Sequence, residues 1–145
     1  MKYGFIGTGN MGGALATAIA RGENAEVLLY DKDMEKAKAL AAKIGAKAVA
    51  FETAVQESHF LFIGVKPYLV KEVLAQVNDA LNNNRPVIVS MAAAITVAQL
   101  SDMISLPVIR ILPNTPALVG KGLALAAKNT LVTDEMTDAV FTKVN

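Results

Sequence analysis

Short apolar or β-branched runs alternate with longer alanine-rich stretches of helical spacing along the whole chain of 145 residues. Predicted strands cover residues 2–7, 27–30, 47–49, 60–65, 86–90, 108–112 and 123–127. Predicted helices cover residues 11–21, 34–44, 53–57, 67–81 and 96–104, and a last one begins near residue 133. This alternation predicts a doubly wound α/β fold, in which right-handed crossovers place helices on both faces of a mostly parallel sheet. An eight-repeat barrel is excluded because it needs about 250 residues.

Composition excludes several kinds of partner. The chain has 14 Lys+Arg against 13 Asp+Glu and lacks basic clusters, so no nucleic acid or anionic membrane surface is expected. Its longest apolar runs are far shorter than the roughly 20 residues of a membrane span, and its first residues do not resemble a signal peptide. A single histidine and no cysteine exclude a multi-histidine metal site and thiolate chemistry, and favour a cytoplasmic location.

A glycine-rich turn lies between the first predicted strand and the first predicted helix. Gly7 permits a tight turn, Gly9 lets a pyrophosphate approach the backbone, and Gly12 lets the helix pack closely on the strand. Asp31 follows 19 residues after Gly12, at the end of the second strand, where a carboxylate can bind ribose hydroxyls. The spacing predicts a Rossmann-like dinucleotide site, with a purely structural tight turn as the alternative.

The choice between NAD and NADP stays open at this level. The carboxylate of Asp31 would repel a 2′-phosphate, whereas the nearby Lys32 and Lys36 could attract one. The pattern favours NAD slightly and leaves NADP open, so the cofactor is expected to be NADP or NAD.

The segments after other predicted strands are the next places to search, because open α/β sheets bind ligands at the carboxyl ends of their strands. Lys66 ends a buried strand, small residues follow Ser90, and two prolines stiffen residues 113–116. Each segment also has a structural interpretation: a solvated strand end, a close packing surface and a stiff turn. His59 is expected to serve a helix-to-strand connection, and no catalytic residue is assigned. The absence of acid/base groups favours a reaction whose chemistry belongs to the cofactor.

Four segments together resemble the pyrroline-5-carboxylate reductase family. They are residues 4–12 (GFIGTGNMG), 64–67 (GVKP), 90–93 (SMAA) and 110–117 (RILPNTPA). The resemblance implies reduction of 1-pyrroline-5-carboxylate to proline by NAD(P)H, in proline biosynthesis. A cyclic imine protonated by solvent already carries positive charge at the carbon that receives hydride, so no strong enzymatic acid is obligatory.

The resemblance also assigns roles to residues of this chain. Residues 6–11 would hold the pyrophosphate, residues 65–67 would border the ribose and nicotinamide, and Ala92, Ala93 and Asn114 would line the nicotinamide side. With the glycine turn and its acidic partner, the expected cofactor-binding set is Ile6, Gly7, Thr8, Gly9, Asn10, Met11, Gly12, Asp31, Lys32, Val65, Lys66, Pro67, Ala92, Ala93 and Asn114. Ala94 departs from the family, which usually has glycine there, and Asp31 departs from the polar or small residue of many relatives.

Family members continue into an all-helical domain that binds substrate and forms the dimer. We expect residues 1–132 to form the cofactor domain and residues 133–145 to begin a helix that leads to that second domain, where the full-length protein would oligomerise. The isolated chain is then expected to be inactive. The alternatives are the cofactor domain of another NAD(P)-dependent imine or hydroxy-acid reductase, and a non-catalytic dinucleotide sensor.

Overall fold

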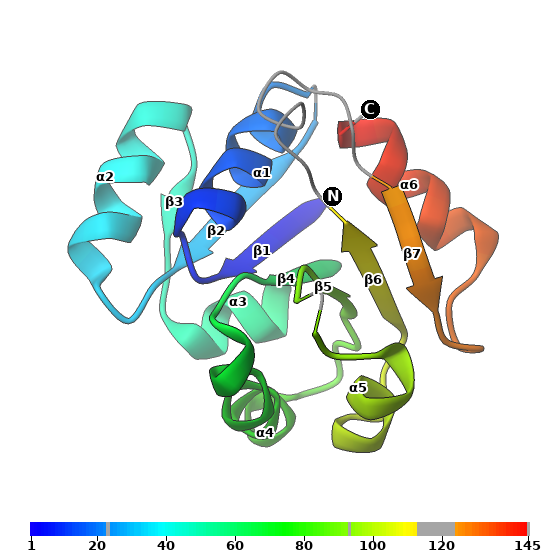
Figure 1. Cartoon of the computed structure of the whole chain (residues 1–145). Coiled ribbons are helices and arrows are strands. Elements are labelled where there is room, and N and C mark those ends of the chain that lie inside the picture. The colour runs from blue at the N-terminus through cyan, green and yellow to red at the C-terminus, as the bar shows by residue number, and fades with distance from the viewer. Residues whose placement is uncertain (23, 93, 113–123, 145) are drawn as a thin grey trace.

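The computed structural model describes residues 1–22, 24–92, 94–112 and 124–144, which form one seven-stranded sheet with helices on both faces (Figure 1). The strands are β1 (Lys2–Ile6), β2 (Glu26–Tyr30), β3 (Lys47–Ala48), β4 (Phe60–Ile63), β5 (Val87–Ser90), β6 (Val108–Leu112) and β7 (Ala124–Lys128). The helices are α1 (Asn10–Ala20), α2 (Met34–Ile44), α3 (Phe51–Glu57), the 3₁₀ turn η1 (Pro67–Leu69), α4 (Val70–Ala80), α5 (Val97–Met103) and α6 (Asp134–Val144). The predicted α/β architecture is confirmed.

The strand order β3-β2-β1-β4-β5-β6-β7 reverses direction between β1 and β4. All neighbouring pairs are parallel except β6 and β7, which are antiparallel. The chain therefore builds outward from β1 on one side and then from β4 on the other. A crevice forms at the carboxyl ends of strands at such a reversal, and this is where open α/β sheets bind ligands.

Two buried clusters, one on each face, hold the sheet between its helices. One contains Leu15 and Ile19 of α1 together with residues of α2 and α6, and the other contains residues of α3, α4 and α5. Alternate strand residues point to opposite faces, and both faces of β4 are apolar and buried. This explains why β4 shows no polar alternation. Figure 1 shows α1, α2 and α6 on one side of the sheet and α3, α4 and α5 on the other.

Local signals in the sequence explain where the helices begin and end. Asp33 accepts a hydrogen bond from the Glu35 N–H at the start of α2, and Gly45, with φ of 75°, ends the same helix. Thr96 forms a capping box with Gln99 at the start of α5. The single predicted helix over residues 67–81 is instead divided into η1 and α4, because Pro67 opens a 3₁₀ turn before the regular helix.

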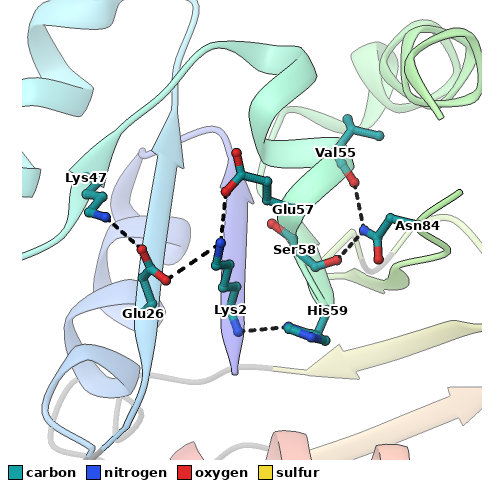
Figure 2. A network of polar contacts seen from close by, with 8 residues as sticks. All are labelled: Lys2, Glu26, Lys47, Val55, Glu57, Ser58, His59 and Asn84. Carbon is teal, nitrogen blue, oxygen red and sulfur yellow. Dashed lines mark hydrogen bonds and ion pairs between the residues drawn. The ribbon is translucent and has the colours of Figure 1, made fainter. Parts of the chain in front are cut away.

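Polar contacts join the amino ends of the strands, at the edge of the sheet opposite to the crevice (Figure 2). Lys2 Nζ lies 2.9 Å from Glu57 Oε1 and 3.9 Å from Glu26 Oε2, and Lys47 Nζ lies 2.9 Å from Glu26 Oε1. His59 Nδ1 accepts a hydrogen bond of 2.9 Å from the Lys2 N–H. His59 therefore has the connecting role expected from the sequence.

No helix in the described part of the chain is both long enough and apolar enough to cross a bilayer.

Candidate functional site

A cleft of about 760 Å³ opens at the carboxyl ends of β1, β2, β4 and β5. Its position coincides with the reversal of strand order between β1 and β4. The residues that line it are Ile6, Gly7, Gly9, Asn10, Met11, Tyr30, Asp31, Lys32, Lys36, Phe51, Gly64, Val65, Lys66, Pro67, Leu69, Glu72, Val73, Gln76, Met91 and Ala92. A cleft of this size is within the range of small-molecule and cofactor sites.

The turn between β1 and α1 requires glycine for two reasons. Gly7 has a φ of 97°, and a Cβ on it would lie 2.7 Å from the carbonyl oxygen of Gly64, so a side chain is excluded both by conformation and by space. The Gly64 N–H donates to the Ile6 carbonyl oxygen at 2.8 Å, which brings the ends of β1 and β4 together. The backbone of the turn therefore forms the floor of the cleft.

Gly9, at the start of α1, has different surroundings. A Cβ added there would meet no atom within 4 Å, so this backbone faces open space. The first N–H groups of a helix have no intrahelical acceptor, and the first turn of α1 contains no acidic side chain. These N–H groups and the positive end of the helix dipole can bind an anion such as a pyrophosphate. The residues therefore fit the phosphate groups of a dinucleotide.

Asp31, directly after β2, joins the end of this strand to the glycine turn. Its Oδ2 accepts hydrogen bonds from the Thr8 N–H and the Thr8 hydroxyl, both at 2.8 Å, and its Oδ1 accepts from the Asp33 N–H at 2.9 Å. Partial burial raises the pKa of this carboxyl, but these hydrogen bonds and the charge of Lys36 outweigh burial, so the pKa lies below its usual value. Asp31 is thus held as a carboxylate at the edge of the cleft.

Other side chains give the cleft charged and aromatic surfaces. Lys32, Lys36 and Lys66 are exposed lysines on its lining. The rings of Tyr30 and Phe51 meet edge to face, with centroids 5.3 Å apart and an interplanar angle of 85°. The cleft therefore offers cations for anionic groups and an aromatic pair for an apolar or planar group.

The turn after β5 forms part of the wall. The Ala92 N–H donates to the buried Ser90 hydroxyl at 3.2 Å, which fixes the backbone directly after the strand. Met91 and Ala92 both line the cleft. A position on the cleft was expected from the sequence for Ala92 but not for Met91.

The expected cofactor-binding residues divide into three groups. The structure brings together Ile6, Gly7, Gly9, Asn10, Met11, Asp31, Lys32, Val65, Lys66, Pro67 and Ala92 on the lining of the cleft. Thr8 and Gly12 do not line it: Thr8 binds Asp31, and Gly12 packs against the turn. Ala93 and Asn114 lie outside the described residues.

Sequence reasoning missed the side of the cleft built from Phe51 at the start of α3 and from η1 and α4. Leu69, Glu72, Val73 and Gln76 line this side. Their spacing of three and four residues places them on one face of a helix, a signal that was present in the sequence. The signal alone did not indicate which helix face turns toward the cleft.

The chain is similar to one protein family and to several individual proteins. A family model described as "NADP oxidoreductase coenzyme F420-dependent" matches residues 2–94. The chain is 37% identical to a pyrroline-5-carboxylate reductase of Escherichia coli over 146 aligned residues, covering 97% of this chain and 54% of that protein. It is 35% identical to a pyrroline-5-carboxylate reductase of Corynebacterium melassecola, covering 93% of this chain and 53% of that protein.

Among solved structures, a 1-pyrroline-5-carboxylate reductase from Streptococcus pyogenes superposes with a TM-score of 0.83 at 25% identity. This superposition covers 100% of the chain and 56% of that protein. The chain therefore spans about half the length of the relatives that it matches.

Proposed function

This chain belongs to the family described as NADP oxidoreductase coenzyme F420-dependent, and from that premise we propose that it binds NAD(P)H and supplies the cofactor half of a pyrroline-5-carboxylate reductase. The reaction is the reduction of 1-pyrroline-5-carboxylate to L-proline. One observation carries the proposal: the glycine turn at the reversal of strand order, where Gly9 faces open space beside the N-terminus of α1. The match to pyrroline-5-carboxylate reductases over nearly the whole chain supports the substrate.

Residues of this chain would take separate parts of the cofactor. The backbone of residues 7–11 would bind the pyrophosphate, Asp31 would face the adenosine ribose, and residues 65–67 with Ala92 would border the nicotinamide side. The roles of Ala93 and Asn114 stay predictions. When bound, the reduced cofactor supplies the hydride.

The protein's own contribution to chemistry would be position and exclusion of water. The substrate is a cyclic imine, which carries positive charge once protonated, so a strong general acid is not required. The buried Ala92 would let a flat ring approach the backbone after β5. The cleft would then need no general acid of its own.

We further propose that a second, helical half of the protein completes the substrate site and forms the oligomer. Support comes from the coverage, since the chain spans 54% of the Escherichia coli reductase. The boundary between residues 132 and 133 stays a prediction. In the structure, α6 lies after this boundary, and its Val140 packs in the same buried cluster as Leu15 of α1. The cytoplasmic location also stays a prediction.

Fluorescence titration of the 145-residue chain with NADH and NADPH tests the cofactor half. We expect saturable binding of at least one nucleotide, and absence of binding to both would refute the proposal. The chain alone should reduce 1-pyrroline-5-carboxylate at a rate near background. Turnover comparable to a complete reductase would show that no second half is needed.

The substrate is tested separately on a version of the protein that extends over the full length of its relatives. Reduction of 1-pyrroline-5-carboxylate in preference to larger imines and to keto acids is the expected result. Preference for another of these substrates would identify a different reductase of the same architecture, and binding without any turnover would identify a dinucleotide sensor.

A further inference from the structure

Thr8 and Asp31 form a pair that joins the glycine turn to the end of β2. Both the backbone N–H and the hydroxyl of Thr8 donate to the same oxygen, Asp31 Oδ2, at 2.8 Å. Asp31 lines the cleft, whereas Thr8 does not. Thr8 can therefore influence a bound ligand through Asp31, although its own side chain does not reach the cleft.

The position of the carboxylate is fixed from two sides. The Asp33 N–H holds Oδ1 at 2.9 Å while Thr8 holds Oδ2, so rotation of the side chain would break three hydrogen bonds. Asp31 is also half-buried, which strengthens hydrogen bonds to a charged acceptor. A ligand group that repels the carboxylate cannot displace it at low cost.

The lysines that could attract a 2′-phosphate are not held in place as the Asp31 carboxylate is. Lys32 and Lys36 are exposed, and a lysine is a strongly hydrated charge on a flexible stem. An exposed lysine gains little from pairing with an anion because water screens the attraction and ordering the side chain costs entropy. A 2′-phosphate at this end of the cleft would therefore meet a fixed negative charge on Asp31 and two exposed, flexible positive charges on Lys32 and Lys36.

We propose that Thr8 is a positioning residue that fixes the Asp31 carboxylate at the ribose end of the cleft, so that the site prefers NADH over NADPH. The proposal rests on the dinucleotide binding proposed above. The ribose of NADH offers a 2′-hydroxyl that can donate to the acceptor position that Asp33 leaves on Oδ1 of the carboxylate, whereas the 2′-phosphate of NADPH would face a fixed negative charge.

The test measures the dissociation constants of NADH and NADPH by fluorescence titration at one fixed ionic strength. The proteins are the wild-type chain, Asp31→Ser, Thr8→Val and the double variant, with Glu35→Gln as the control for loss of an exposed carboxylate outside the cleft. The wild-type chain and the Glu35→Gln control should both bind NADH more tightly than NADPH. Asp31→Ser should shift the ratio of the two constants toward NADPH by about tenfold or more.

Thr8→Val should shift the ratio in the same direction by a smaller factor, because the backbone N–H of residue 8 still holds the carboxylate. The double variant should match Asp31→Ser, since Thr8 acts through Asp31. A fully additive double variant, or an unchanged ratio in Thr8→Val, would overturn the role of Thr8. Tighter binding of NADPH by the wild type, or an unchanged ratio in Asp31→Ser, would overturn the preference.

The proposal stays testable if Asp31→Ser fails to fold. Competition against NADH by AMP and by adenosine 2′,5′-bisphosphate then uses the wild-type chain alone. AMP should displace NADH at the lower concentration, and stronger displacement by the bisphosphate would contradict the proposal. Failure of the wild type to bind either dinucleotide would instead refute the proposed function.

Discussion

Gly12 of α1 packs against the carbonyl oxygen of Gly7 so closely that a Cβ added to Gly12 would lie 2.5 Å from that oxygen. The contact joins the first turn of the helix to the floor of the cleft. Gly9, three residues earlier, has no atom within 4 Å of the corresponding position. One glycine of the turn thus serves packing and the other leaves space for a ligand.

Gly12→Ala should destabilise the protein by about 1–3 kcal/mol, because the oxygen that the methyl group meets belongs to the backbone and cannot move freely. Urea unfolding followed by circular dichroism measures this loss. Dinucleotide affinity should fall as well, since α1 must shift away from the turn.

Gly9→Ala is the matched comparison for the packing role of Gly12. Its free energy of unfolding should change less than that of Gly12→Ala, because the new methyl group projects into open space. Its dinucleotide affinity should nevertheless fall about tenfold or more, since the methyl group occupies the approach of the pyrophosphate. Equal losses of stability in the two variants would contradict this division of roles.

Ser58 carries a buried hydroxyl that finds no hydrogen-bond partner within the described part of the chain. Ser58→Ala should therefore leave the free energy of unfolding unchanged or raise it, because a buried unpaired hydroxyl costs about 1–3 kcal/mol. Urea unfolding provides the measurement. A clear loss of stability would show that the hydroxyl is satisfied in solution.

The same hydroxyl explains why residue 4 is glycine. A Cβ on Gly4 would overlap Ser58 Oγ and lie 3.0 Å from Ser58 Cβ. Gly4→Ala should be destabilising, and the double variant with Ser58→Ala should recover part of the loss. The recovered part appears as a coupling free energy in a double-mutant cycle, and simple additivity would exclude the contact as the cause.

The sequence predicted the elements best where capping chemistry and hydrophobic pattern agree. The bounds of α2 and β6 match the predicted ranges 34–44 and 108–112, and Asp33 and Gly45 explain the first of these. The glycine motif and its spacing led to Gly7 and Asp31, and the carboxyl ends of the strands led to Lys66. All three line the cleft because that edge of a parallel sheet brings them together whatever the details of packing.

Features that depend on contacts distant in sequence could not be predicted in the same way. The pairing of Thr8 with Asp31 joins residues 23 positions apart and depends on where the glycine turn lies beside β2. The antiparallel direction of β7 has no local signal, since strand residues look alike in either direction. The cleft face of α4, with Glu72 and Gln76, required the orientation of the helix on the sheet.

Asn84 connects the loop before β5 to the end of α3 (Figure 2). Its Nδ2 donates to the carbonyl oxygens of Ser58 at 2.7 Å and Val55 at 3.2 Å. Asn84→Ala should cost about 1–3 kcal/mol because both partly buried carbonyl groups lose their side-chain donor. Asn83→Ala, at the exposed neighbouring position, is the control in urea unfolding. A loss in Asn84→Ala no larger than that in the control would contradict this role.

Asp31 should make stability depend on pH in the acid range. Burial raises the pKa of its carboxyl, but hydrogen bonds from the Thr8 and Asp33 N–H groups and the Thr8 hydroxyl, with the charge of Lys36, bring the native pKa below the ordinary value of 3.8. The native state therefore binds this proton less readily than the unfolded state. The stability that the carboxylate contributes is fully present well above pH 3.8, begins to fall as the unfolded state takes up the proton near pH 3.8, and is lost as the pH falls through the lower native pKa.

Asp31→Asn removes this pH-dependent contribution. The difference in the free energy of unfolding between the wild type and Asp31→Asn should be largest near neutral pH and shrink as the pH falls from about 5 to about 3. Asp79→Asn, at an exposed position of α4, controls for loss of one surface carboxylate. Urea unfolding over this pH range checks the sign: a difference that grows on acidification would mean that the native state favours the protonated carboxyl, against the hydrogen bonds from Thr8 and Asp33.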